Sequence, residues 1–135
     1  MEDQTAGVAR RLMETYAAGD VDGLLECLAD DWVMHNADGT TSGASQLADI
    51  TRLHNTAFPD LRVEFLHEVA NDDFAALHVV FTGTHTGRLL DLDATGKQVR
   101  LEEMNFHRIA DGSIAESWLL TYPSGMYAQL VDGDG

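Results

Sequence analysis

Polar and ionisable side chains recur at every second position of one otherwise apolar segment near the end of the chain. This alternation limits the fold more than any other feature. The segment covers residues 98–109, and the three side chains are Glu103, Asn105 and His107. Because successive side chains of a strand point to opposite faces, the pattern predicts a strand with all three on one face. Such groups are costly to bury without partners, so that face either is solvated, with Glu103 paired to a neighbouring arginine, or lines a functional cavity.

Strand patterns fill most of the second half of the chain. Alternating apolar residues predict strands at 61–70, 74–84, 98–109 and 113–122. Turn signals at Asn71-Asp72-Asp73 and Asp111-Gly112 separate two of the pairs, and 87–97 is an irregular link. Consecutive strands joined by short turns favour antiparallel pairing.

The first half of the chain is mainly helical. The predicted elements are a helix at 4–18, a short helix that Asp20 caps, a strand at 30–36, a loop at 38–43 and a helix from Ser45 to Ala57. Pro59 closes the last helix, because a proline disfavours helix at the preceding residue. The order predicts one α+β domain over residues 1–135, with a curved, mostly antiparallel sheet and three N-terminal helices forming a cone-shaped pocket. We expect residues 131–135 to be a frayed tail.

Charge excludes several classes of partner. The chain has 8 basic and 23 acidic side chains, a formal net charge of −15. Nucleic acids and anionic membranes bind clustered Lys and Arg, and no segment approaches membrane-spanning length, so neither partner is expected. The one cysteine, Cys27, lies in an apolar run and cannot form an internal disulfide, which favours a reducing compartment. We therefore expect a cytoplasmic protein with a small-molecule substrate.

No metal or cofactor is expected. No two of the six histidines stand four residues apart, and a single cysteine cannot form a ligand cluster. The glycines of the Gly83 to Gly87 corner lack the downstream helix that a dinucleotide fingerprint needs, and no nucleophile elbow or phosphate-binding loop is present.

Five short motifs carry a resemblance to a known family. They are Phe58-Pro59-Asp60-Leu61, Gly83-Thr84-His85-Thr86-Gly87, Ala94-Thr95-Gly96-Lys97, Arg108-Ile109-Ala110-Asp111-Gly112 and Ile114-Ala115-Glu116-Ser117-Trp118. In this order the chain resembles the SnoaL-like branch of the nuclear-transport-factor-2-like superfamily. The resemblance implies a cone with a deep apolar pocket. It also implies a homodimer through the outer sheet face, here around Met104 and Phe106.

The chain departs from the family at one position that matters for chemistry. Family cyclases usually carry an acid/base Asp four residues after the Trp of the last strand, and here that residue is Tyr122. A phenol donates a hydrogen bond but is a poor base at neutral pH. The usual His before the Trp is Ser117. The aldol-cyclase assignment therefore cannot be transferred residue for residue.

The alternation and the resemblance together predict a catalytic group. His107 or Glu103 would be the base, and Tyr122 and Asn105 would donate hydrogen bonds to an enolate. This requires the set that ends with Tyr122 on the last strand, including Trp118, to face the cone. By the resemblance, His35 either lines the pocket mouth or is a hydrogen-bonded surface residue.

The remaining candidates would contact substrate. The predicted binding residues are Trp118, Phe81, Tyr16, His54, His85 and Trp32. For His54 the alternative is a solvent-facing position. For His85 it is a structural role, in which the ring holds the 87–97 link in place.

Three functions follow from this site. The first is a cofactor-independent cyclase or isomerase of secondary metabolism, such as antibiotic biosynthesis, that acts on a polyketide-like carbonyl compound by proton transfer. The second keeps the pocket but changes the reaction to that of an epoxide hydrolase, dehydratase or hydroxylase. The third is a non-catalytic ligand-binding or dimerisation module, which a pocket closed by packed side chains would favour.

Overall fold

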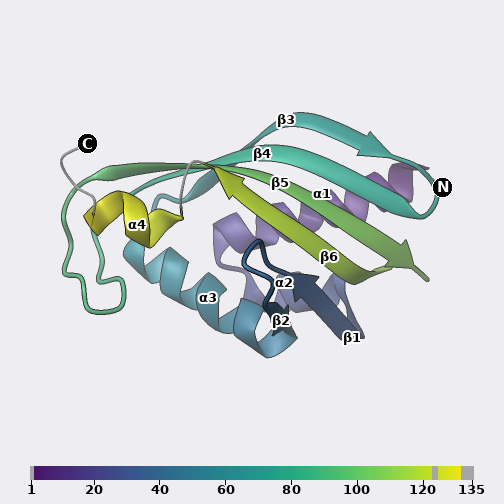
Figure 1. The fold of residues 1–135 in the computed structure, drawn as a ribbon, viewed down its shortest axis with the longest axis horizontal. Helices are drawn as coiled ribbons and strands as arrows, with labels where there is room; N and C mark the ends of the chain where they lie inside the picture. Colours follow the sequence, from purple (N-terminus) through teal and green to yellow (C-terminus); the bar gives the residue numbers. More distant parts are fainter. Residues whose placement is uncertain (1, 123–124, 132–135) are drawn as a thin grey trace.

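A computed structural model describes residues 2–122 and 125–131, and the side chains of residues 4–121 and 125–131 (Figure 1). The helices are α1 (Glu2–Ala18), α2 (Val21–Glu26), α3 (Ala44–Ala57) and α4 (Met126–Val131). The strands are β1 (Leu28–His35), β2 (Thr41–Gly43), β3 (Arg62–Ala70), β4 (Phe74–Thr84), β5 (Gln98–Ala110) and β6 (Ser113–Tyr122).

All six strands form one open sheet in the order β2-β1-β6-β5-β4-β3. Strands β3 to β6 form an antiparallel meander, and β1 adds to its edge parallel to β6. Figure 1 shows the sheet curving over α1, α2 and α3, which lie on its concave side. The predicted fold class, α+β with a curved and mostly antiparallel sheet against three N-terminal helices, is confirmed.

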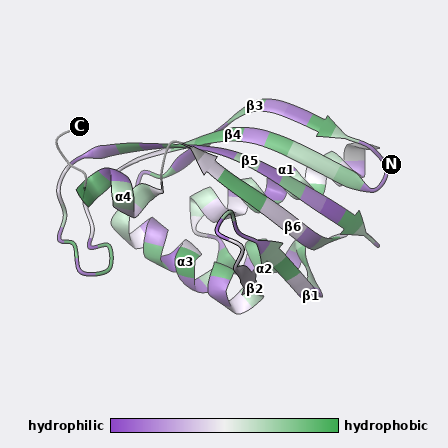
Figure 2. Cartoon of the chain, in the orientation of Figure 1, coloured by the Kyte–Doolittle hydropathy of each residue, from purple (hydrophilic) through white to green (hydrophobic). Residues whose placement is uncertain are grey.

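The core lies between the concave face and the helices. Its largest fully buried side chains include Leu24, Phe58 and Phe81. Along β4 every second residue from Ala75 to Phe81 is buried, and Figure 2 shows hydrophobic and hydrophilic residues following one another along the strands. None of the helices in the described residues is long and apolar enough to cross a membrane.

Two elements differ from the sequence-based prediction. Thr41–Gly43, predicted as loop, is strand β2, because it pairs with Val33 to His35 of β1. The segment 126–131, not predicted as helix, is α4, so only residues 132–135 of the predicted tail lie outside the described part. A six-residue helix is unstable alone, and here the buried Met126 and Leu130 hold it against the domain.

The link after β4 docks on the C-terminal end of α3. The backbone N–H groups of Thr86 and Gly87 both donate to the Ala57 carbonyl, at 3.1 and 3.0 Å. The backbones approach so closely at Gly87 that a Cβ there would lie 2.0 Å from the Thr56 carbonyl oxygen. Only glycine fits at this contact.

The substitution Gly87→Ala is therefore expected to destabilise the domain by about 2–3 kcal/mol, because the added methyl collides with rigid backbone. Urea unfolding followed by circular dichroism measures the change. Gly7→Ala is the control, since Gly7 lies within α1 with open space around it and should gain about 0.5–1 kcal/mol. Equal stabilities for Gly87→Ala and wild type would contradict the close approach.

Candidate active site

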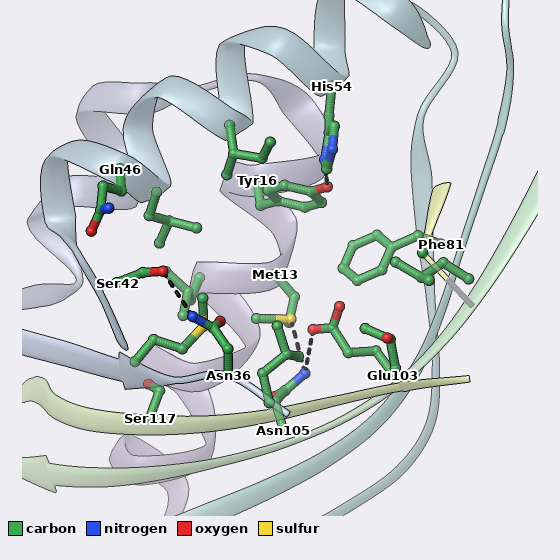
Figure 3. Close-up of a pocket in the computed structure, with 18 of the residues that line it drawn as sticks. Met13, Tyr16, Asn36, Ser42, Gln46, His54, Phe81, Glu103, Asn105 and Ser117 are labelled. Atoms are coloured by element: carbon green, nitrogen blue, oxygen red, sulfur yellow. Dashed lines mark hydrogen bonds between the residues drawn. The ribbon is translucent and has the colours of Figure 1, made fainter. Parts of the chain in front are cut away.

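A cavity of about 550 Å³ opens between the concave face of the sheet and the helices. This volume is in the range that small-molecule sites occupy. Apolar side chains make up much of the wall, among them Leu12, Met13, Leu24, Met34, Leu47 and Phe81. Figure 3 shows the polar side chains that interrupt this wall. The site therefore suits a largely apolar ligand with a few polar groups.

The three alternating side chains of β5 line this cavity. Glu103, Asn105 and His107 are 8%, 5% and 2% exposed, so they face inwards as the alternation predicts. The opposing positions on β6 are Thr121, Leu119 and Ser117. The prediction that the face lines a cavity, rather than being solvated, is confirmed.

A chain of hydrogen bonds connects five buried side chains and has one direction. Trp32 Nε1 donates to Ser117 Oγ at 3.0 Å, and Ser117 Oγ lies 2.6 Å from His107 Nδ1. His107 Nε2 lies 2.7 Å from Asn105 Oδ1, which can only accept, so the ring proton is on Nε2. Asn105 Nδ2 then donates to Glu103 Oε1 at 2.9 Å. Because Nδ1 of the neutral ring is an acceptor, the Ser117 hydroxyl donates to it, and every bond points toward Glu103.

The two candidate bases, His107 and Glu103, differ in their pKa values and in which of their atoms are free of hydrogen bonds. Burial lowers the pKa of His107 to about 4, so the imidazole stays neutral. Both ring nitrogens are already hydrogen-bonded to protein side chains, which leaves neither available to a ligand. Burial raises the pKa of Glu103 to about 7, partly offset by the hydrogen bond from Asn105. Within the described residues, Glu103 Oε2 accepts no hydrogen bond. Glu103 is therefore the group able to exchange a proton with a ligand near neutral pH.

A second polar pair faces the same end of the cavity. Tyr16 of α1 and His54 of α3 are joined by a hydrogen bond between Oη and Nδ1. Burial, together with the charge of Glu103, raises the pKa of Tyr16, and burial lowers the pKa of His54 to about 4. The phenol therefore keeps its proton and the imidazole is neutral. Figure 3 shows Tyr16, Glu103 and Phe81 around one part of the cavity.

His35 and Trp118 lie on the other face of the sheet. The His35 ring stacks on Trp118 with centroids 5.1 Å apart, and its Nε2 lies 2.6 Å from Glu116 Oε2. Trp118 is 37% exposed, although it is also among the residues that line the cavity. Of the two positions left open for His35, the structure shows the surface one. The prediction that the Trp118 side of β6 faces the cone is wrong, because a bulge between Arg108 and Ile109 shifts the register of β6 by one residue.

Tyr122 and His85 complete the predicted set. The side chain of Tyr122 lies outside the described residues; its backbone pairs with Glu102, and Thr121 is the cavity-lining residue opposite Glu103. His85 is fully buried, does not line the cavity, and accepts the Thr95 N–H on Nδ1 at 3.1 Å. Of its two predicted roles, the structure shows the one that holds the 87–97 link.

Phe81, Tyr16, His54 and Trp32 all line the cavity, and their contact with substrate stays a prediction. Sequence reasoning missed Ser117, and also Asn36, Ser42 and Gln46, which line the opposite end. The turn-like composition of 38–43 concealed Ser42, because a loop prediction says nothing about which side chains face inwards. Ser117 would have been found only by locating the bulge.

The raised pKa of Glu103 makes stability depend on pH. The folded carboxyl holds its proton up to about pH 7 instead of 4.5, so its contribution is fully present below 4.5 and is lost as the pH rises through 7. Relative to wild type, Glu103→Gln should therefore become more stable by about 3 kcal/mol between pH 4.5 and 8. Glu102→Gln, on the opposite face of the same strand, is the control. Hydrogen bonds from His78 and Arg100 lower the pKa of Glu102, so this carboxyl titrates below the tested pH range and the stability difference should stay constant across it. A pH-independent difference between Glu103→Gln and wild type in urea unfolding would contradict the shift.

Comparison with solved structures shows the same fold in several bacterial proteins. AclR from Streptomyces galilaeus, a candidate hydroxylase, has a TM-score of 0.88 and 20% identity over 100% of this chain and 85% of that one. IdmH from Streptomyces antibioticus, a candidate polyketide cyclase, has a TM-score of 0.79 and 27% identity over 95% and 99%. A candidate ketosteroid isomerase from Kribbella flavida has a TM-score of 0.68 and 17% identity over 92% and 82%.

Among curated proteins no match is found. The family model described as SnoaL-like polyketide cyclase matches residues 6–130, nearly the whole chain. The cavity, the concave sheet and this match agree, and the chain belongs to the SnoaL-like polyketide cyclase family.

Proposed function

We propose that the protein moves a proton at a carbon next to a carbonyl of a polyketide-like small molecule, and so catalyses cyclisation or isomerisation without a cofactor. The observation that carries this proposal is the buried Glu103 carboxyl, with a pKa of about 7 and one oxygen free of hydrogen bonds within the described residues. A general base is most effective when its pKa lies near the working pH. The family and its cyclase and isomerase neighbours support the same class of reaction.

In the proposed step Glu103 carries one proton away from the substrate and later returns it. Glu103 takes the proton from the carbon, and the electron pair moves onto the carbonyl oxygen to give an enolate. The Tyr16 hydroxyl donates a hydrogen bond to this oxygen, while its own oxygen accepts the Nδ1–H of the neutral His54 ring. The proton on Glu103 then passes to another carbon of the enolate in an isomerisation. In a cyclisation it passes to the alkoxide oxygen formed when the enolate attacks a second carbonyl.

Asn105 and His107 act in this proposal as positioning residues. The Asn105 amide holds Glu103 Oε1, and His107 fixes which way that amide points, because its Nε2–H bonds the Asn105 oxygen. The rival reaction of epoxide opening is expected to use a histidine to activate water. Both ring nitrogens of His107 are engaged in hydrogen bonds, which argues against His107 in that role. The open cavity favours catalysis over a purely structural module.

Exchange of the hydrogens next to the carbonyl of 1-oxo-1,2,3,4-tetrahydrophenanthrene with D₂O, followed by mass spectrometry, tests the base. Glu103→Gln should slow exchange at least ~100-fold, and Tyr16→Phe about tenfold. The wild-type rate should rise as the pH passes through about 7, because Glu103 must be ionised. Glu102→Gln should keep the wild-type rate. A Glu103→Gln enzyme as fast as wild type would remove Glu103 from the mechanism.

We also infer a homodimer formed through the convex face of the sheet. Four large apolar side chains are exposed there: Met104 (55%), Phe106 (42%), Trp118 (37%) and Leu120 (61%). They are contiguous, since Met104 pairs with Leu120 and Phe106 with Trp118 across β5 and β6. Adjoining exposed apolar residues mark an interaction surface, and a second copy would cover them symmetrically.

Sedimentation velocity at micromolar concentration tests the dimer. Met104→Glu combined with Leu120→Glu should convert a dimer into a monomer, because each partner would bury unpaired charge. Leu90→Glu is the control, since Leu90 is 60% exposed in the link between β4 and β5 and is not on the sheet face. A wild-type protein that sediments as a monomer would contradict the inference.

The proposed setting is secondary metabolism, such as antibiotic biosynthesis, in a reducing cytoplasm. The likeness to IdmH, a candidate polyketide cyclase from Streptomyces antibioticus, supports the first part. The one cysteine, Cys27, is free and buried, which suits a reducing compartment.

A further inference from the structure

The cavity has a second polar end that the proposed reaction does not use. We define the mouth cluster as Asn36, Ser42 and Gln46, which come from the position just after β1, from β2 and from the first turn of α3. Figure 3 shows the mouth cluster on the side away from Glu103, with Met13 between the two ends. The cavity therefore offers hydrogen-bonding groups at both ends and an apolar surface between them.

The two amides of the mouth cluster are held in fixed orientations. Asn36 Nδ2 donates to Ser42 Oγ at 3.0 Å and to Thr40 Oγ1 at 3.1 Å, which leaves its Oδ1 as an acceptor. Gln46 Oε1 accepts the Gly43 N–H at 2.7 Å, which leaves its Nε2 as a donor. Within the described residues no other hydrogen bond uses these two atoms. Their orientation is set before a ligand arrives, so little entropy is lost on binding.

The charge of the cavity limits what can fill it. None of the described residues that line it is Lys or Arg, and its titratable side chains are Glu103, His54, His107 and the tyrosines. A carboxylate or phosphate at the mouth cluster would have no cation of the cavity wall to pair with. Such an anion would lose part of its hydration without a charged partner, which is unfavourable.

We propose that the mouth cluster is a second subsite, which binds an uncharged oxygen group (a hydroxyl or a carbonyl) at the far end of an elongated substrate. This rests on the proposed function, in which the reacting carbonyl lies at Glu103. The donor of Gln46 and the acceptor of Asn36 together accommodate a hydroxyl, and the donor of Gln46 alone accommodates a carbonyl.

Equilibrium dialysis tests this subsite with three probes, two neutral and one anionic, that share the same rigid steroid skeleton. They are testosterone, androst-4-ene-3,17-dione and the 17β-carboxylate of the same enone, which differ only in the group at the far end. Wild type should bind the two neutral probes with similar Kd values. It should bind the carboxylate at least ~10-fold more weakly, because the anion has no partner.

The variant Gln46→Glu exchanges the donor for an acceptor while keeping the oxygen that caps α3. The Kd of the dione relative to testosterone should rise at least ~5-fold, because two acceptors then face each other, whereas a hydroxyl can still donate. Ser45→Glu is the matched control: it adds the same charge at the neighbouring exposed position, which does not line the cavity, and should leave the ratio unchanged.

Four results would overturn the subsite. Three are an unchanged ratio in Gln46→Glu, a carboxylate that binds as tightly as testosterone, and no binding of either neutral probe to wild type. The fourth is a ratio that changes in Glu103→Gln instead, which would place the far group at the other end of the cavity. These Kd values do not depend on proton transfer. Failure of Glu103 as the base would therefore appear only in the exchange rates.

Discussion

The hydrogen bond from Asn105 to Glu103 is the interaction on which the rest of the site depends. It holds one oxygen of a buried carboxyl and leaves the other toward the cavity. A carboxylate in an apolar wall is costly, and here the cost appears as a raised pKa rather than as an ion pair. An arginine in place of Asn105 would lower the pKa of the Glu103 carboxyl and make it a weaker base. The neutral amide of Asn105 instead leaves that pKa near 7.

The longer hydrogen-bond chain explains why so many polar groups lie in this core. Trp32, Ser117 and His107 each satisfy the next, so none is left as an unpaired buried group. A fully satisfied network fixes one orientation of the Asn105 amide, and a partly satisfied one would not. Stability and function are therefore linked, since the same bonds that make burial tolerable also orient the base.

Much of this arrangement was predictable from the sequence, and the errors have local physical causes. The period-two pattern of β5 placed Glu103, Asn105 and His107 on one face, and the structure confirms it. The same reasoning failed on β6, because a single bulged residue reverses which side chains face inwards. The sequence also could not separate Glu103 from His107 as the base. That distinction comes from burial and from partners on other strands, Ser117 of β6 and, 85 residues away from it in the chain, Trp32 of β1.

The sequence by itself determined the α+β class, the order of the main elements and the composition of the inner face of β5, because these follow from local periodicity and turn chemistry. Only the tertiary structure decided that the pKa of Glu103 is raised and that His107 stays neutral, since both follow from burial. It also decided that Tyr16 and His54 meet beside Glu103, and that α4 and β2 form at all. Elements this short are stable only through the contacts that the folded chain supplies.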